Sequence, residues 1–123
     1  MRRRSTTLTG QELEIMKIVW ERESVTVRDV YEALLERRKV AYTTVMTMMK
    51  ILEQKKYLKK TAVDRAHVYR PAQPKGQVVG AMVREFVNRV FNGSAEPLLV
   101  HLVQEHNLSR EDLDEIARLR RKA

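Results

Sequence analysis

The feature that most constrains the fold is a helix-start signal that occurs twice within the first thirty residues. In Thr9-Gly10-Gln11-Glu12, and again in Thr26-Val27-Arg28-Asp29, a threonine is followed three residues later by a carboxylate. Each of these groups can accept a hydrogen bond from a backbone N–H that the first helical turn leaves free. Apolar residues follow both signals at helical spacing. The pattern predicts two short helices joined by a short polar link.

A third helix and a hairpin are predicted next. The helix begins near residues 41–43, and from Tyr57 to Arg70 the sequence indicates two short strands with a turn at residues 64–66. Prolines at 71 and 74 end the hairpin and form a linker. Three helices followed by a hairpin is the order of a winged helix-turn-helix. The apolar side of the third helix, spaced i, i+3, i+4, i+7, is Val45, Met48, Met49 and Leu52.

Beyond the linker the sequence is helical again. Residues 76–91 are apolar around much of a helix, and Asn92-Gly93 ends it because both residues tolerate the left-handed conformation. A second helix follows, and the capping box Ser109-Arg110-Glu111-Asp112 opens a third. We therefore expect a mainly α fold with a small β-hairpin. Its parts are an N-terminal winged helix-turn-helix over residues 8–72 and a C-terminal three-helix dimerisation region over 76–121.

Charge indicates different roles for the two parts. Of the net charge of +8, residues 1–70 carry +7, with 16 Lys and Arg against 9 Asp and Glu. Such an asymmetry is typical of a polyanion-binding part joined to a neutral part with another task. A basic protein without a polyanionic partner is the alternative, so the charge needs support from the architecture.

The composition disfavours several other classes of protein. There is no cysteine, hence no disulfide and no thiolate metal site, which fits the cytoplasm. The apolar stretches are far shorter than the roughly 20 residues that cross a bilayer. His101 and His106 are five apart, which on a helix points them in different directions and disfavours a metal pair. Without a glycine-rich phosphate loop or a recognisable Ser/His/Asp set, we expect no enzyme activity, no cofactor and no metal.

The third helix is the best candidate for contact with DNA, because in this fold it enters the major groove. Its side opposite the apolar one carries threonine, lysine and glutamine and no acidic residue. Threonine and lysine can bind bases or phosphates, whereas an ordinary solvated face usually mixes charges of both signs. The start of the helix favours phosphate, and the basic run Lys55, Lys56, Lys59 and Lys60 and the hairpin would bind the backbone. The predicted DNA-binding residues are Tyr42, Thr43, Thr44, Met46, Thr47, Lys50, Gln54, Lys59, Lys60, Arg65 and His67.

The C-terminal part is predicted to form a homodimer. Its first helix is apolar over a wider arc than a surface helix needs, and only two short helices are available to cover it. A second monomeric lobe is the alternative. A two-fold dimer predicts a palindromic operator. The predicted interface residues are Val79, Met82, Val83, Phe86, Val90, Leu98, Leu99, Leu102, Leu113 and Ile116.

Four stretches of the chain resemble the penicillinase-repressor family of winged-helix transcriptional regulators. They are residues 8–16 with Trp20, residues 26–30, Ala41-Tyr42-Thr43-Thr44-Val45-Met46-Thr47, and Asp64-Arg65-Ala66-His67-Val68-Tyr69. The resemblance spans about residues 8–121. It implies a repressor dimer on palindromic operators with TACA/TGTA-type half-sites, controlling β-lactamase-type or other stress-response genes.

The resemblance also implies an inactivating sensor protease as a partner. Members are cleaved at an Asn–Phe bond in the dimerisation region, where this chain has His101-Leu102. Copper-responsive members use a C-terminal cysteine motif, which this chain lacks. Two alternatives to specific DNA binding stay open: a winged-helix protein-interaction module, and a small RNA-binding protein.

Overall fold

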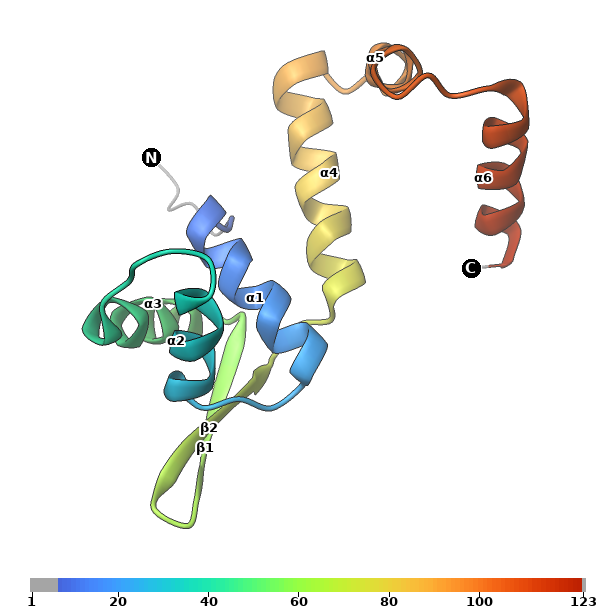
Figure 1. Ribbon diagram of the computed structural model, residues 1–123. Helices are drawn as coiled ribbons and strands as arrows, with labels where there is room; N and C mark the ends of the chain where they lie inside the picture. Colours follow the sequence, from blue (N-terminus) through green and yellow to red (C-terminus); the bar gives the residue numbers. More distant parts are fainter. Residues whose placement is uncertain (1–6, 123) are drawn as a thin grey trace, which may run out of the picture. The chain divides into compact units, whose positions relative to one another are not determined.

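The computed structural model describes residues 7–122 and contains six helices and one hairpin within that range (Figure 1). The elements are α1 (Gly10–Arg22), α2 (Val27–Leu35), α3 (Tyr42–Gln54), β1 (Leu58–Val63), β2 (Ala66–Pro71), α4 (Lys75–Phe91), α5 (Glu96–Glu105) and α6 (Arg110–Lys122). The chain forms two compact units, which divide between Val79 and Gly80 inside α4. The mainly α fold with one hairpin is confirmed.

The predicted capping boxes are present and set the starts of α1 and α2. The Glu12 backbone N–H donates to Thr9 Oγ1 over 3.1 Å, and the Thr9 N–H donates to Glu12 Oε1 over 2.9 Å. Thr26 and Asp29 exchange the same two bonds at the start of α2. Because these amides are satisfied within the chain, both helices begin at defined residues.

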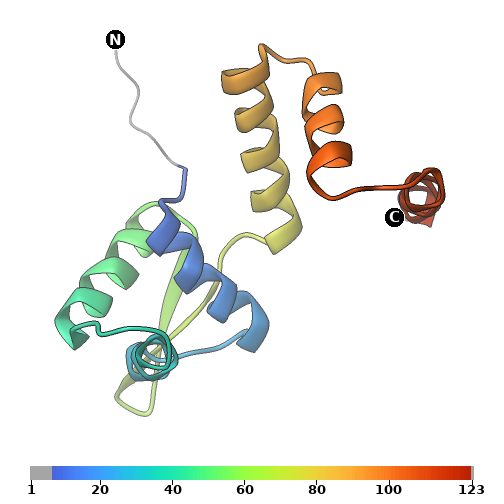
Figure 2. The same ribbon diagram turned by 45° about the horizontal axis from the view of Figure 1, so that its top comes forward.

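The first unit packs α1, α2 and α3 around one apolar core. Figure 2 views α2 along its axis, with α1 and α3 on either side of it. The largest fully buried side chains come from all three helices, the α1–α2 link and β1; they are Ile15, Met16, Val19, Val25, Val30, Leu34, Val45, Met49, Leu52 and Leu58. This core fixes which side of α3 is left facing solvent.

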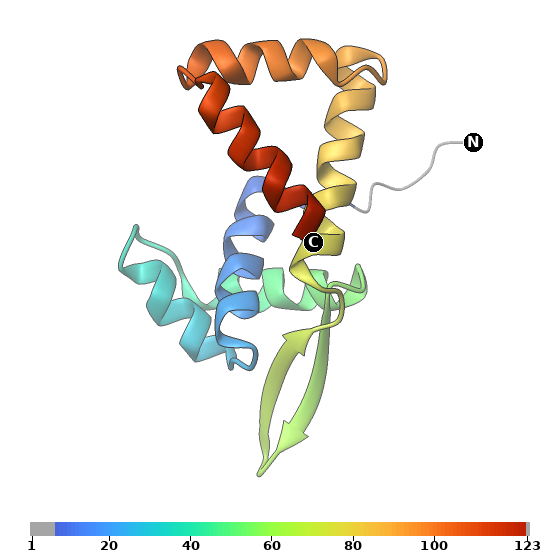
Figure 3. The same ribbon diagram turned by 90° about the vertical axis from the view of Figure 1, so that its right-hand side faces the viewer.

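The hairpin is antiparallel and is anchored to the helices by a third, short pairing. Its register joins Leu58 to Pro71 and Val63 to Ala66, so the turn is Asp64-Arg65, one residue shorter than the predicted 64–66, because Ala66 already pairs in β2. Val25, in the link between α1 and α2, exchanges two backbone hydrogen bonds with Tyr69, of 3.0 and 2.7 Å. This pairing fixes the base of the hairpin against the helices while its tip projects away from them (Figure 3).

The second unit leaves most of its apolar side chains exposed. After α4 the chain turns at Asn92 and Gly93, both with positive φ, as predicted, and the third capping box, Ser109 with Asp112, opens α6. Helices α4, α5 and α6 follow one another along the chain with short turns between them (Figure 1). Among the described side chains of this unit only Val87 is buried. Across residues 7–122 no helix is both long and apolar enough to span a membrane.

Candidate nucleic-acid interface

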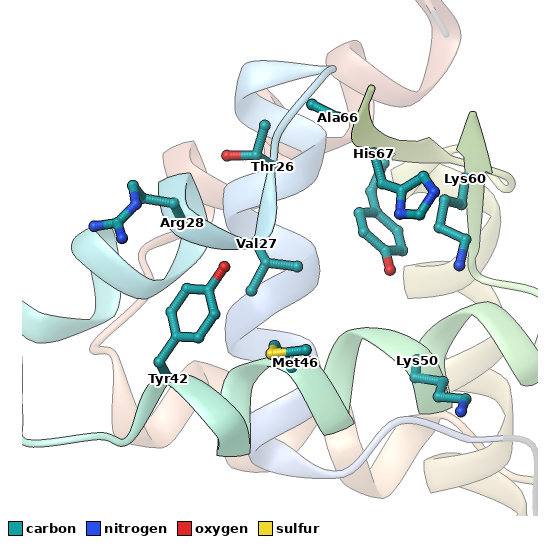
Figure 4. Close-up of a pocket in the computed structure, with 10 residues that line it drawn as sticks. Thr26, Val27, Arg28, Tyr42, Met46, Lys50, Lys60, Ala66 and His67 are labelled. Carbon is teal, nitrogen blue, oxygen red and sulfur yellow. The ribbon is translucent and has the colours of Figure 1, made fainter. Parts of the chain in front are cut away.

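A groove opens between the start of α2, the exposed side of α3 and the hairpin (Figure 4). Its volume is about 420 Å³. Figure 4 shows Arg28 and Tyr42 at one side of it and Lys60 and His67 at the other, with α3 running along the floor. The lining residues are Thr26, Val27, Arg28, Tyr42, Met46, Lys50, Lys60, Ala66, His67 and Tyr69.

Helix α3 is oriented as its apolar spacing predicts. Val45, Met49 and Leu52 are fully buried, whereas Met48, expected on the same side, is only half-buried. The opposite side presents exposed Thr43, Thr47, Lys50 and Gln54. Met46 is 48% exposed and lies over the groove, which places an apolar, flexible side chain among polar ones.

The strand register separates the two lysines of β1. Lys60 pairs with Tyr69 and Ala62 with His67, so Lys60 and His67 point to the same face of the hairpin, the face that lines the groove. Lys59 is the neighbour of Lys60 and pairs with Arg70, so it points to the opposite face. The register therefore brings Lys60 and His67, but not Lys59, to α3.

The remaining predicted residues lie around the groove rather than in it. Thr43, Thr44, Thr47 and Gln54 are exposed along α3, and Arg65 occupies the hairpin turn. Of the eleven predicted residues, the groove itself brings together Tyr42, Met46, Lys50, Lys60 and His67.

Lys55 has a structural role instead of the predicted phosphate contact. Its Nζ donates to both carboxylate oxygens of Glu12, over 2.9 and 3.1 Å, and to the Thr7 carbonyl oxygen over 3.2 Å. Burial raises the pKa of Glu12, but the bonds from Lys55 and Thr9 outweigh it, so the pKa lies below its ordinary value of 4.5. A lysine held by a buried carboxylate is not free to bind DNA.

Sequence reasoning missed the α2 side of the groove. In the sequence Arg28 belongs to a capping box and to the 26–30 stretch, with no sign of a groove contact, yet its guanidinium lies 5.8 Å from the centroid of the Tyr42 ring. Tyr31 contacts Tyr42 edge to face, with ring centroids 5.2 Å apart. The available signal was an arginine in the first turn of α2, the helix that precedes α3.

The electrostatics of the groove favour an anionic ligand. The described residues that line it include Arg28, Lys50 and Lys60 and no carboxylate. The acids that contact these cations stand outside the lining: Glu32 lies 3.6 Å from Arg28, and Glu53 lies 3.9 Å from Lys60. Burial, with the charge of Glu53, raises the pKa of Tyr69, so its hydroxyl stays protonated. No group of three metal-ligating side chains occurs in the described part of the chain.

Comparisons with known proteins agree with this arrangement. The family model described as penicillinase repressor matches residues 8–122. The transcriptional regulator BlaI of Mycobacterium tuberculosis is 40% identical over 118 residues, which cover 94% of this chain and 82% of that protein. The penicillinase repressor of Bacillus licheniformis is 26% identical over 109 residues, covering 89% of this chain and 85% of that protein.

Two solved structures are similar to the first unit. The solution structure of the DNA binding domain of the repressor BlaI has a TM-score of 0.53 at 26% identity, covering 60% of this chain and 90% of that one. The monomeric form of B. licheniformis BlaI in complex with the blaP half-operator has a TM-score of 0.51 at 27% identity, covering 57% of this chain and 85% of that one.

Proposed function

The chain belongs to the penicillinase repressor family, and from this premise we propose that it is a transcriptional repressor that binds a palindromic operator as a homodimer. The observation that carries the proposal is the groove beside α3, which has three cations and no carboxylate among its described lining residues. Such a surface attracts the phosphate backbone, and an exposed helix next to it supplies the groups that read bases. The complex of the relative with its half-operator supports the same assignment.

In this proposal α3 enters the major groove. Thr43, Thr47, Lys50 and Gln54 face the base edges, where lysine suits guanine acceptors and the threonine methyl suits the thymine methyl. Met46 adds apolar contact. Tyr42 and Thr44 bind phosphate at the start of the helix, and the hairpin residues Lys59, Lys60, Arg65 and His67 bind the adjacent backbone.

The dimer is proposed from the exposed apolar surface of the C-terminal part. Val79, Val83, Phe86 and Val90 recur along one side of α4, and each is at least 39% exposed. Contiguous apolar surface of this kind marks an interaction site. The proposed interface is residues 79–90 of α4 with apolar positions of α5 and α6, within a dimerisation region of residues 76–121 that follows a DNA-binding domain of residues 8–72.

Two linked DNA-binding units gain affinity because the second binds at a high effective concentration. A two-fold dimer then reads a palindrome. The TACA/TGTA half-sites, β-lactamase-type or other stress-response target genes, and a sensor protease enter the proposal through the family. His101 and Leu102 are exposed but lie inside α5, so cleavage between them requires α5 to open locally.

The proposal is tested by operator selection followed by competition. The wild-type chain is used to enrich duplexes from a random library, and the selected duplex is compared with its scrambled form and with an RNA duplex of the same sequence at near-physiological salt. We expect at least 10³-fold preference for the selected DNA, a typical ratio for specific binders. Equal binding of selected and scrambled duplexes favours a protein-interaction module, and tighter RNA binding favours an RNA-binding protein.

Base readout by α3 is tested with Thr47→Ala. Thr47 is exposed and opposite the core, so the substitution leaves folding intact and reduces discrimination at one base position by roughly tenfold, or about 1.4 kcal/mol. Lys17→Ala, on α1 and away from the groove, is the control. If base preference is unchanged in Thr47→Ala, the DNA-facing side of α3 is misassigned.

A further inference from the structure

Arg28 occupies a position in the groove that the proposed function does not use. It lies in the first turn of α2, its side chain is 68% exposed, and it lines the groove on the side away from the hairpin (Figure 4). Figure 4 shows it beside Tyr42, whereas Lys60 and His67 stand across the groove. Helix α3 therefore runs between two cationic sides that come from different elements.

An aromatic pair supports the Arg28 side chain. The guanidinium carbon is 5.8 Å from the Tyr42 ring centroid, within the range of a cation–π contact. Tyr42 is held in turn by Tyr31, whose ring meets it at 82°. A guanidinium that rests on a braced ring loses less freedom on binding a ligand than one that moves in solvent. The contact thus pre-positions a cation at the N-terminal end of α3.

The Arg28 side chain contributes little to the stability of the fold. Its ion pair with Glu32 spans 3.6 Å between two side chains that are each more than 60% exposed, and exposed pairs of this kind contribute little to stability. The capping box of α2 uses the side chains of Thr26 and Asp29 to satisfy each other's backbone N–H groups and does not involve the Arg28 side chain. The exposed Arg28 side chain is therefore available to an anion that approaches this side of the groove.

We propose that Arg28 binds a backbone phosphate of the operator on the side of α3 opposite the hairpin, so that α3 is held in the major groove from both sides. The proposal rests on the proposed function and extends it. An arginine fork suits phosphate better than a lysine, because it donates two parallel hydrogen bonds. Tyr42 is the positioning residue for this contact, in addition to its own place at the start of α3.

The test compares Arg28→Ala, Arg28→Lys and the control Lys17→Ala on the duplex that the wild-type chain selects from a random library. Lys17→Ala also removes one positive charge, but from a separate hollow of the same unit. For Arg28→Ala we expect a loss of affinity of roughly tenfold, equal for all sequences, and a salt slope lower by about one. Arg28→Lys should recover only part of the affinity, and Lys17→Ala should change it less than twofold.

Two further measurements make the result specific to a phosphate contact. Ethylation of individual phosphates should show one interfering position in the wild type that no longer interferes in Arg28→Ala. Glu32→Gln removes the competing carboxylate and should raise affinity by about twofold. If Arg28→Ala behaves like Lys17→Ala while the wild type still binds its selected duplex, the assignment of Arg28 is wrong and the proposed function stands. If the wild-type chain enriches no duplex from the library, the proposed function itself is wrong.

Discussion

Lys55 at the end of α3 and Glu12 in the first turn of α1 form a nearly buried ion pair, with 2.9 Å between Nζ and Oε1. The same Oε1 accepts a hydrogen bond from the Thr9 N–H, so a single carboxylate both caps α1 and binds α3. The side chain of Glu12 is 7% exposed and that of Lys55 is 21% exposed. This pair fixes the helix that carries the proposed base contacts to the first helix of the chain.

Glu12→Gln should therefore destabilise the first unit by about 2 kcal/mol at neutral pH, because it leaves the half-buried ammonium of Lys55 without a negatively charged partner. The pKa of Glu12 is lowered in the folded chain, so its contribution is complete above the unfolded value of about 4.5 and is lost as pH falls below it through the folded pKa. Urea unfolding between pH 7 and pH 3 should show a smaller acid-induced loss in Glu12→Gln than in wild type.

The exposed acid Glu21 on the same helix provides the matched control. Glu21→Gln should leave both the stability at pH 7 and the acid dependence within about 0.5 kcal/mol of wild type. Parallel pH profiles for wild type and Glu12→Gln would show that the pair with Lys55 does not set acid stability.

The register of the hairpin points the two adjacent lysines of β1 to opposite faces. Lys60 points into the groove and Lys59 points to the other face of the hairpin. We expect Lys60→Ala to weaken operator binding by about fivefold and to lower the salt slope by about one, and Lys59→Ala to have a smaller effect. Filter binding over a range of salt concentrations measures both. Equal effects would mean that only the total charge of the hairpin matters.

The sequence could predict those parts of the fold that depend on local pattern. The capping boxes fixed the starts of α1 and α2, and the spacing of Val45, Met49 and Leu52 fixed which side of α3 is exposed. The position of the hairpin turn, at Asp64-Arg65, could also be predicted from the residues of the turn itself to within one residue. Each of these features is decided by residues within one or two helical turns of each other.

The features that sequence reasoning missed depend on contacts between distant residues. In the sequence Lys55 is one of four lysines in a basic run. Its ion pair with Glu12, 43 positions away, becomes visible only in the packed structure. Val25 gave no strand signal, because a single bridge to Tyr69 has no periodicity. Arg28 needed the placement of Tyr42 before it could be assigned to the groove.

The hairpin turn combines backbone strain with a cation at its tip. Asp64 and Arg65 both have positive φ, at 49° and 71°, a conformation that glycine adopts at little cost. Arg65→Gly should stabilise the first unit by about 1 kcal/mol, raising Tm by about 4 °C, while weakening operator binding several-fold. Arg65→Lys keeps the charge and should bind nearly as wild type. Calorimetry and filter binding together separate the effects; a Gly variant that binds normally would exclude Arg65 from the interface.

The last prediction concerns the exposed side of α4. Phe86 is 40% exposed, contacts Phe91 edge to face, and lies on the same side of the helix as Val79, Val83 and Val90. Burying a carboxylate at the centre of an apolar interface is costly, so Phe86→Asp should give a monomer by light scattering.

The same monomer should bind the full operator at least a hundredfold more weakly, because the effective concentration of the second half is lost, yet keep wild-type affinity for one half-site. Asn88→Asp places the same carboxylate on the opposite side of α4 and is the control for charge; it should remain dimeric. A Phe86→Asp chain that stays dimeric while Asn88→Asp dissociates would move the interface to the other side of α4.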